Sequence, residues 1–275
     1  MGLGIELKTA DEIAIMRDAG MVVFEVLEEL EKIVAPGITL EELDAVAERE
    51  TLRRGATCAF MGLYGFPKHI CISVNEQVVH GIPTRRKLNE GDIVKLDHGA
   101  VIKGWFGDSA RTIGVGKIAP EVKTLLEVTR DSLDAGIKAM VPGNRVSDIG
   151  AAVEALVLPH GYGIVRDYVG HGIGKKPHED PQVPNYGPSR WNRGQPNPRL
   201  RAGMVLAVEP MINLGTHETE TLPDGWTVVT KDGRWSAHWE HTIAITEDGP
   251  KVLTRPSSLD PKLSELSPAL ARAGA

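Results

Sequence analysis

Cysteine, long apolar runs and an excess of basic residues are scarce or missing in this 275-residue sequence. Its two cysteines, Cys58 and Cys71, are too few for an extracellular disulfide framework. No apolar run approaches the ~18–20 residues that a membrane-spanning helix needs. The balance of 31 basic against 37 acidic residues gives a net charge of −6, so the totals show no nucleic-acid-binding footprint.

The N-terminal segment lacks targeting features as well. Residues 1–6 do not form the basic and apolar regions of a secretory signal, and Glu6 stands where a myristoylation motif needs Ser or Thr. We therefore expect a cytoplasmic globular protein, with a length that suits one large or two small domains. The sequence contains nine histidines, and this number favours a search for metal chemistry.

Two capping boxes predict the first two helices. Thr9–Glu12 and Thr39–Glu42 each place a threonine three residues before a glutamate, so that each side chain can bind the backbone N–H of the other residue. Apolar residues at helical spacing follow both boxes. The first helix should stop at Pro36-Gly37 and the second near Gly55, because proline and glycine mark helix ends.

This helical pair recurs further along the chain. Adding 106 to the residue numbers places Pro36-Gly37 on Pro142-Gly143 and Gly55 on Gly161, with matched apolar and acidic positions between them. Two unrelated amphipathic helices could match by chance, but the shared stop signals favour a true repeat. The repeat predicts two α/β halves, each a helical pair followed by strands, with a pseudo-twofold relation.

Strand-like segments follow each helical pair, and a stretch rich in Pro, Asn, Gly and Arg at 185–201 predicts a surface loop. No interdomain linker is visible, so we expect one domain over residues 1–256 and a short, weakly helical tail over 257–275. The predicted strands cover 68–74, 92–101 and 105–115 in the first half and 163–169, 204–212, 226–230 and 236–246 in the second.

Two aspartates flank a predicted hairpin turn at Lys103-Gly104, where glycine supplies a positive φ. This turn sets Asp97 opposite Ala110 and makes Asp108 its diagonal neighbour on the same face, ~7–8 Å away at Cα. Two carboxylates that converge on one face repel each other unless a cation lies between them. The alternative is that both are surface residues, as aspartates near turns often are.

A glycine-rich stretch from Gly170 to Glu179 carries His171 and His178. Glycines beside a histidine let the backbone approach a ligand closely. The plainer interpretation is a histidine in a flexible loop. The spacing of seven does not fit one strand face, so the two histidines need not share a role.

Glu209 ends an apolar run and Glu240 lies within a strand pattern. A buried carboxylate is unfavourable unless it is paired or bound to a metal, although a salt bridge at a sheet rim would also suffice. Four carboxylates with one imidazole suit Mn, Fe(II), Co or Zn rather than a soft thiolate-binding metal. Bridging acids can hold two metals ~3.5–4 Å apart, with a shared hydroxide that attacks a carbonyl or phosphoryl centre.

In this order and with their flanking residues, Asp97, Asp108, His171, Glu209 and Glu240 resemble the dinuclear metal site of type I methionine aminopeptidases. The similarity covers nearly the whole chain. It is carried by the motifs Ser73–Glu76, Val79–Pro83, Gly107-Asp108, Gly170–Gly174, His178-Glu179, Gly203-Met204, Glu209-Pro210 and Glu240–Thr242.

The resemblance implies the pita-bread fold, in which two pseudo-symmetric α/β halves surround a curved antiparallel sheet. It also implies two divalent metal ions (Mn, Fe(II), Co or Zn) bound by the five side chains named above, with Asp108 and Glu240 bridging both ions. By the same resemblance, Glu209 accepts the proton of the nucleophilic water, His178 hydrogen-bonds the scissile carbonyl, and His80 contacts the peptide nitrogen.

The activity implied is removal of the initiator methionine from nascent proteins and peptides with a small second residue, by a hydroxide that bridges the metals. The resemblance places Phe66, Cys71 and Trp226 in the wall of the methionine pocket, although all three would equally suit ordinary core packing. Leu63 and Pro177 stand where relatives commonly carry aromatic residues, which leaves the shape of the pocket open.

Nascent polypeptide N-termini, met at the ribosome, are the expected partners, and we expect a monomer that binds neither nucleic acid nor membrane. One alternative is a pita-bread peptidase that cleaves Xaa-Pro bonds. Such relatives usually carry an additional N-terminal domain, which is not expected where the first capping box begins at Thr9. The other alternative is a metal-free binding module of the same fold, which would have lost ligands that are all present here.

Overall fold

The computed structural model describes residues 4–259, and its first two helices begin where the sequence predicts. The first two start with the predicted capping boxes, in which Thr9 pairs with Glu12 and Thr39 with Glu42. The predicted C-terminal tail falls mostly on residues 260–275, outside the described residues. The helices are α1 (Ala10–Ile33), α2 (Leu40–Arg53), α3 (Pro120–Lys138) and α4 (Val146–Val157).

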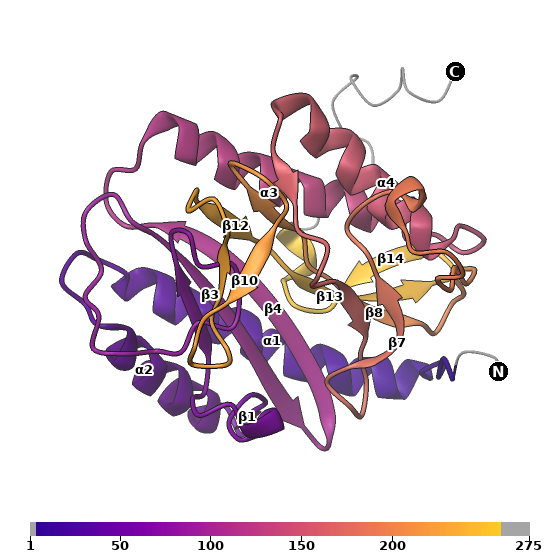
Figure 1. The fold of residues 1–275 in the computed structure, drawn as a ribbon. Coiled ribbons are helices and arrows are strands. Elements are labelled where there is room, and N and C mark those ends of the chain that lie inside the picture. The colour runs from indigo at the N-terminus through magenta and orange to yellow at the C-terminus, as the bar shows by residue number, and fades with distance from the viewer. Residues whose placement is uncertain (1–3, 260–275) are drawn as a thin grey trace.

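The predicted repeat is confirmed in the backbone. Gly37 and Gly143, which are 106 residues apart, have φ values of 96° and 97°, and Gly55 and Gly161 have 75° and 73°. The same offset relates the two strands that follow the helical pairs, β1 (Thr57–Cys58) and β5 (Gly163–Ile164). Figure 1 shows the two halves side by side, each with its own helical pair.

The sheet of the first half is built on one long hairpin. β3 (Ile93–Ile102) pairs along its whole length with β4 (Trp105–Gly114), and β1 and β2 (Cys71–Val74) pair with its other edge. Lys103 and Gly104 form the turn with φ values of 49° and 80°. The register places Asp97 opposite Ala110, as predicted from the turn.

Two strands of the second half are interrupted, so the continuous strands predicted over 204–212 and 236–246 were wrong in this respect. Glu209-Pro210 separates β8 (Val205–Val208) from β9 (Met211–Asn213), and Trp239-Glu240 separates β12 (Ser236–His238) from β13 (His241–Thr246). Proline has no N–H to donate to a ladder, which explains the first break. Both breaks place an acid between two strand segments.

The strands observed within the predicted ranges 163–169 and 226–230 are shorter than predicted. The strands of the second half form three antiparallel sheets. The five-stranded sheet has the order β14-β13-β8-β6-β7, the three-stranded sheet the order β12-β9-β5, and β10 pairs with β11 in a separate ribbon. The remaining strands are β6 (Gly170–Gly172), β7 (Glu179–Val183), β10 (Thr219–Thr221), β11 (Val228–Thr230) and β14 (Gly249–Val252).

The two halves join where β4 meets the break between β12 and β13. Ala110 N donates to Glu240 O over 3.3 Å, and Glu240 N donates to Ala110 O over 2.9 Å. Nearby, Asp108 N donates to Thr242 Oγ1 over 3.0 Å, and that hydroxyl donates back to Asp108 O over 2.8 Å. These bonds carry the sheet of the first half into the second.

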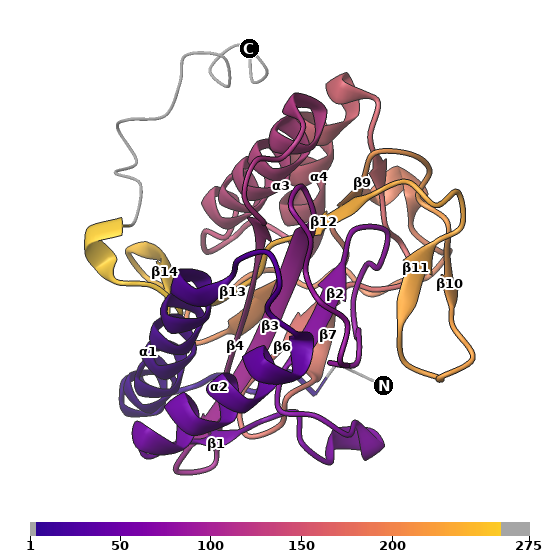
Figure 2. The ribbon, with the colours of Figure 1, turned by 90° about the vertical axis from the view of Figure 1, so that its left-hand side faces the viewer.

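The two faces of the first sheet have different partners. Val94 and Leu96 pack in a core with residues of α1 and α2, and Figure 2 shows this helical pair on one side of β3. His98 lies on the helix-covered face, with Nε2 2.9 Å from Thr51 Oγ1 of α2. Asp97 therefore faces the opposite side.

Within the described residues, no helix has the length and apolar content to cross a membrane.

Two glycines allow α1 to lie directly against β4. A Cβ added at Gly107 would lie 2.7 Å from the backbone nitrogen of Gly20. We predict that Gly107→Ala lowers the free energy of unfolding by about 1–3 kcal/mol, because the helix and the strand must move apart. Urea denaturation measures this, with Gly4→Ala as the matched control, since its added Cβ meets nothing within 4 Å. Equal midpoints for the two variants would contradict the prediction.

Candidate metal centre and substrate pocket

A cavity of about 270 Å³ lies on the face of the sheet opposite α1 and α2. The structure brings all five ligands predicted from the sequence to the wall of this cavity. They are Asp97 from β3, Asp108 from β4, His171 from β6, and Glu209 and Glu240 from the two strand breaks.

Two carboxylates of the cavity each have one oxygen without a hydrogen-bond donor. Oxygen Oδ1 of Asp97 and Oδ1 of Asp108 are buried without a partner. One potential ligand atom from each of Asp108, His171 and Glu240 lies within 4.8 Å of the others. A buried acceptor without a donor is unfavourable, so these oxygens fit a cation held among them. Oxygen ligands with one imidazole suit a divalent metal of the Mn, Fe(II), Co or Zn type.

Burial and mutual repulsion hold these acids toward their neutral forms when no cation is present. Burial raises the pKa of Asp97 to about 7. Burial also raises the pKa of Asp108 and Glu240 well above the usual range, and the charges of the neighbouring carboxylates add to the shift. The pKa of Glu209 rises for the same reasons, with Asp97 as the charged neighbour. A divalent cation would allow these groups to ionise.

His171 is oriented as a metal ligand needs to be. Its Nδ1 lies 2.9 Å from Gly172 O, so Nδ1 carries the hydrogen and donates to that carbonyl. Nε2 is then free and lies 3.5 Å from Glu209 Oε1. Burial, with the charge of His178 as the next cause, lowers the pKa of His171 to about 3, which keeps the ring neutral.

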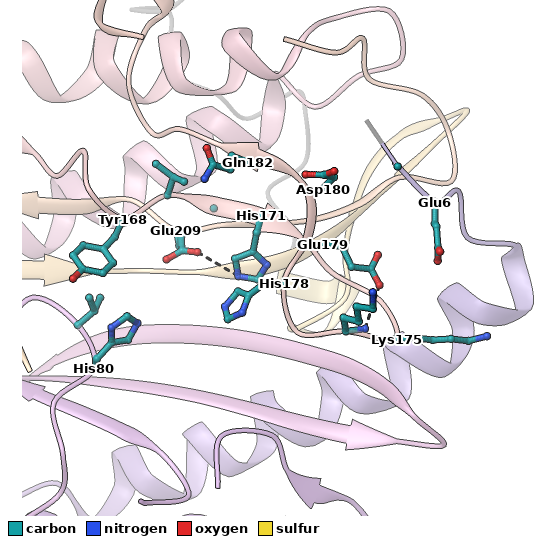
Figure 3. A pocket seen from close by; sticks show the side chains of 15 residues that line it. Glu6, His80, Tyr168, His171, Lys175, His178, Glu179, Asp180, Gln182 and Glu209 are labelled. Atoms are coloured by element: carbon teal, nitrogen blue, oxygen red, sulfur yellow. Dashed lines mark hydrogen bonds and ion pairs between the residues drawn. The ribbon is translucent and has the colours of Figure 1, made fainter. Parts of the chain in front are cut away.

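The two further histidines expected to contact substrate also line the cavity. The ring of His178 packs edge-on against His171, with centroids 4.4 Å apart. His80 has a positive φ of 59° and packs edge-on against Tyr168 at 5.4 Å. In Figure 3 the side chains of His80, His178 and Glu209 gather around one space. Burial lowers the pKa of His178. Burial also lowers the pKa of His80 to about 4, with the charge of His178 as a second cause.

An apolar compartment adjoins the acids. Phe66, Cys71 and Trp226 all line the cavity, and the rings of Phe66 and Trp226 meet edge-to-face at 5.1 Å. Cys71 pairs with Asp97 in the β2–β3 ladder, which places the apolar wall directly beside the carboxylates. Burial raises the pKa of the Cys71 thiol, so this side chain acts as a small neutral group.

A wider groove of about 770 Å³ shares His80, His171, His178 and Glu209 with the cavity. It continues past Lys176 and Asp180 to Glu6. Figure 3 labels Asp180 and Glu6 at the outer part of this groove. The cavity is therefore the inner end of an open path.

Sequence reasoning missed three residues of this region. Phe60 and Tyr64 line the cavity, and neither lies in a segment with a recognisable pattern. His238 is buried with both ring nitrogens unpartnered, and its Nε2 lies 4.0 Å from Glu209 Oε2. Strand alternation from Glu240 would have placed His238 on the same face.

Leu63 and Pro177, where relatives commonly carry aromatic residues, differ in whether they line the cavity. Leu63 lines the cavity, beside the apolar cluster formed by Phe60, Phe66 and Cys71. Pro177 is not among the described residues that line it. The replacement at Leu63 therefore bears directly on the pocket wall.

Comparisons with known proteins find similar sequences and structures over nearly the whole chain. The model of metallopeptidase family M24 matches residues 14–247. Methionine aminopeptidase 1 of Bacillus subtilis is 52% identical over 248 residues, which cover 90% of this chain and 98% of that protein. The crystal structure of the methionine aminopeptidase of Thermotoga maritima superposes with a TM-score of 0.87 and 43% identity, covering 92% of this chain and 100% of the other.

A more distant structure shares only the fold. The prolidase of Pyrococcus furiosus superposes with a TM-score of 0.72 at 24% identity. The match covers 91% of this chain but 66% of the prolidase. The pita-bread fold is thus common to both kinds of peptidase.

We predict that the metal-free protein loses stability as the pH rises from 7 to 8.5. The buried carboxyls have raised pKa values in the folded chain and ordinary ones in the unfolded chain, so the folded state binds more protons in this range. Each such carboxyl contributes a slope of up to about 1.4 kcal/mol per pH unit. Urea denaturation at several pH values measures the effect.

Asp108→Asn removes one of these groups and should flatten that slope, whereas Asp232→Asn changes a surface carboxyl and serves as the control. Saturating Mn(II) should also flatten the slope of the unsubstituted protein, since a cation permits ionisation. Stability of the metal-free protein that stays constant or rises over this range would contradict the prediction.

Proposed function

The chain belongs to metallopeptidase family M24, among its methionine aminopeptidases, and we propose that it removes the initiator methionine from nascent proteins and peptides with a small second residue. The observation that carries the proposal is one cavity with four acids, three neutral histidines and an apolar compartment. We place the reaction in the cytoplasm, where a monomer would meet new N-termini at the ribosome.

Two divalent ions would be held by the five ligands. Asp97 would bind one ion, His171 and Glu209 the other, and Asp108 and Glu240 both. The unpartnered carboxylate oxygens and the orientation of His171 support this assignment. When bound, such ions supply Lewis acidity for the scissile carbonyl and lower the pKa of water.

Glu209 is the proton carrier in this proposal. Its Oε1 faces His171, which lines the cavity, and its Oε2 faces the buried His238, so the carboxylate lies between these two histidines. It accepts the proton of the attacking water and delivers it to the leaving amine. Its place in the wall of the cavity suits both steps, because a general acid–base group must lie within reach of the proton that it moves.

His178 and His80 act as neutral donors. Each neutral imidazole has one N–H to donate, and burial keeps the pKa of both rings below the usual value. His178 donates to the carbonyl oxygen as negative charge develops on it, and His80 contacts the peptide nitrogen. Donors that are already oriented in a buried site stabilise such charge strongly.

The apolar compartment and the groove divide the substrate between them. Phe66, Cys71 and Trp226 would surround the methionine side chain, whose thioether makes favourable contacts with aromatic rings. The remainder of the peptide would leave along the groove past Lys176 and Asp180. This division explains why an N-terminal residue, rather than an internal one, would reach the acids.

A panel of peptides tests the proposal. We predict that the protein loaded with Mn(II), Co(II) or Fe(II) cleaves Met-Ala-Ser at least about a hundredfold faster, in kcat/KM, than Ala-Pro peptides or Met peptides with a bulky second residue. Release of free methionine, followed by mass spectrometry, measures cleavage. Preferential cleavage of Ala-Pro would support an Xaa-Pro peptidase, and no cleavage with any metal would overturn the enzyme proposal.

We predict that His178→Ala lowers kcat about 10²–10³-fold, because it removes a donor to the developing oxyanion. Metal occupancy, measured by elemental analysis, should stay unchanged, since His178 is not among the five ligands. His160→Ala, at a histidine outside the cavity, is the control. Unchanged turnover in His178→Ala would refute the assignment of this donor.

A further inference from the structure

A short loop of the first half overhangs the cavity. It runs from Phe60 to Phe66, whose buried rings anchor its ends. Gly62 N donates to Phe66 O and Leu63 N donates to Phe60 O, both over 2.9 Å, so the loop is closed at its base. Its tip is Tyr64, in a 3-10 turn over Leu63–Gly65.

Tyr64 has an unfavourable backbone conformation for its size. Its φ of 51° and ψ of 16° lie in the left-handed region, between Gly62 and Gly65, which also have positive φ values. A residue with a Cβ is strained there. The residue is 73% exposed, so burial of its ring does not offset the strain. The conformation does bring the ring to one specific neighbour.

That neighbour is His178 of the second half. The hydroxyl of Tyr64 lies 3.4 Å from Nδ1 of His178, and the two rings are stacked at 5.8 Å with 19° between their planes. The ring of His171 meets His178 edge-on at 4.4 Å. The imidazole of His178 is therefore held between Tyr64 and His171, with its Nδ1 directed toward the tyrosine.

We infer that Tyr64 is the positioning residue of His178. The tyrosine O–H donates to Nδ1, which leaves the imidazole hydrogen on Nε2, the nitrogen available to the substrate carbonyl. The inference rests on the proposed function, because it deepens the role of His178 as a donor. Tyr64 touches neither the reacting atoms nor the metal ligands in this assignment, and it acts through His178.

The contact also connects the two halves across the mouth of the cavity. Tyr64 and Leu63 are successive residues with different surroundings, since Leu63 packs with the apolar cluster and Tyr64 stacks on His178. A methionine side chain that enters the compartment would press on the loop through Leu63. A side chain in the pocket would thus affect the position of His178 through Leu63 and Tyr64.

Tyr64→Phe tests the inference, because it keeps the ring and removes the hydroxyl. We expect kcat on Met-Ala-Ser to fall about three- to tenfold with KM nearly unchanged, the effect of losing one neutral hydrogen bond. Tyr162→Phe is the matched control, since Tyr162 stacks on His160 at 5.6 Å outside the cavity. A tyrosine that only covers the pocket would change KM instead, and that result would overturn the inference.

A double-mutant cycle separates this inference from the proposed function. In a His178→Ala background, Tyr64→Phe should have no further effect on kcat, because its partner is absent. Independent, multiplied losses would overturn the positioning role. If the unsubstituted protein fails to release methionine, or if His178→Ala has full activity, the proposed function fails instead.

A spectroscopic measurement gives a readout that does not depend on activity. Nitrogen-15 shifts of the histidine rings in metal-free protein report which ring nitrogen carries the hydrogen, and the His178 signals are identified by their loss in His178→Ala. We expect the Nε2–H form in the unsubstituted protein and in Tyr162→Phe, and a mixture of both forms in Tyr64→Phe. The same single form in all three proteins would overturn the inference.

Discussion

Four carboxyl groups around one buried cavity set the main constraint on this structure. Like charges repel strongly away from water, and none of the described residues that line the cavity is a lysine or arginine. Lys95, two residues before Asp97 on the same face, is buried but directs its ammonium group to the carbonyls of Asn75 and Ser236. Compensating charge must therefore come from protons or from bound cations.

The pseudo-symmetry of the chain explains how the acids meet. Asp97 and Glu209 are 112 residues apart. The same offset separates Gly91 and Gly203, which lie two residues before β3 and β8 and have φ values of 92° and 91°. Each half thus contributes an acid at an equivalent point of its sheet. The second acid of each half lies at the junction between them, Asp108 on β4 and Glu240 in the break between β12 and β13. A site shared by two repeated halves needs both, which makes the fold of either half alone insufficient for metal binding.

The part of this site that follows from local rules was predictable from the sequence. The turn at Lys103-Gly104 determines the register of β3 and β4, so the diagonal relation of Asp97 and Asp108 follows from the position of the turn in the sequence. The break at Glu209-Pro210 was missed, because an apolar run that continues beyond an acid has the local pattern of a single strand. Likewise, no spacing rule connects Tyr64 with His178, since their contact depends on how the two halves close on each other.

The site divides its tasks between sheet and loops for a physical reason. Repelling acids need a rigid support, and the backbone bonds between Ala110 and Glu240 supply it together with those between Asp108 and Thr242. The proposed donors to the substrate carry no net charge, so the loops of Tyr64 and His178 can hold them without opposing a large force. Peptides vary in shape while a metal ion does not, and contacts that must adapt to a peptide are better placed on loops than on a ladder. In the proposed function, metal affinity rests on the acids at the junction of the sheets, while peptide selectivity rests mainly on loops, with Cys71 of β2 as the point where the two meet. A change in one loop would then alter selectivity while the four acids stay in place.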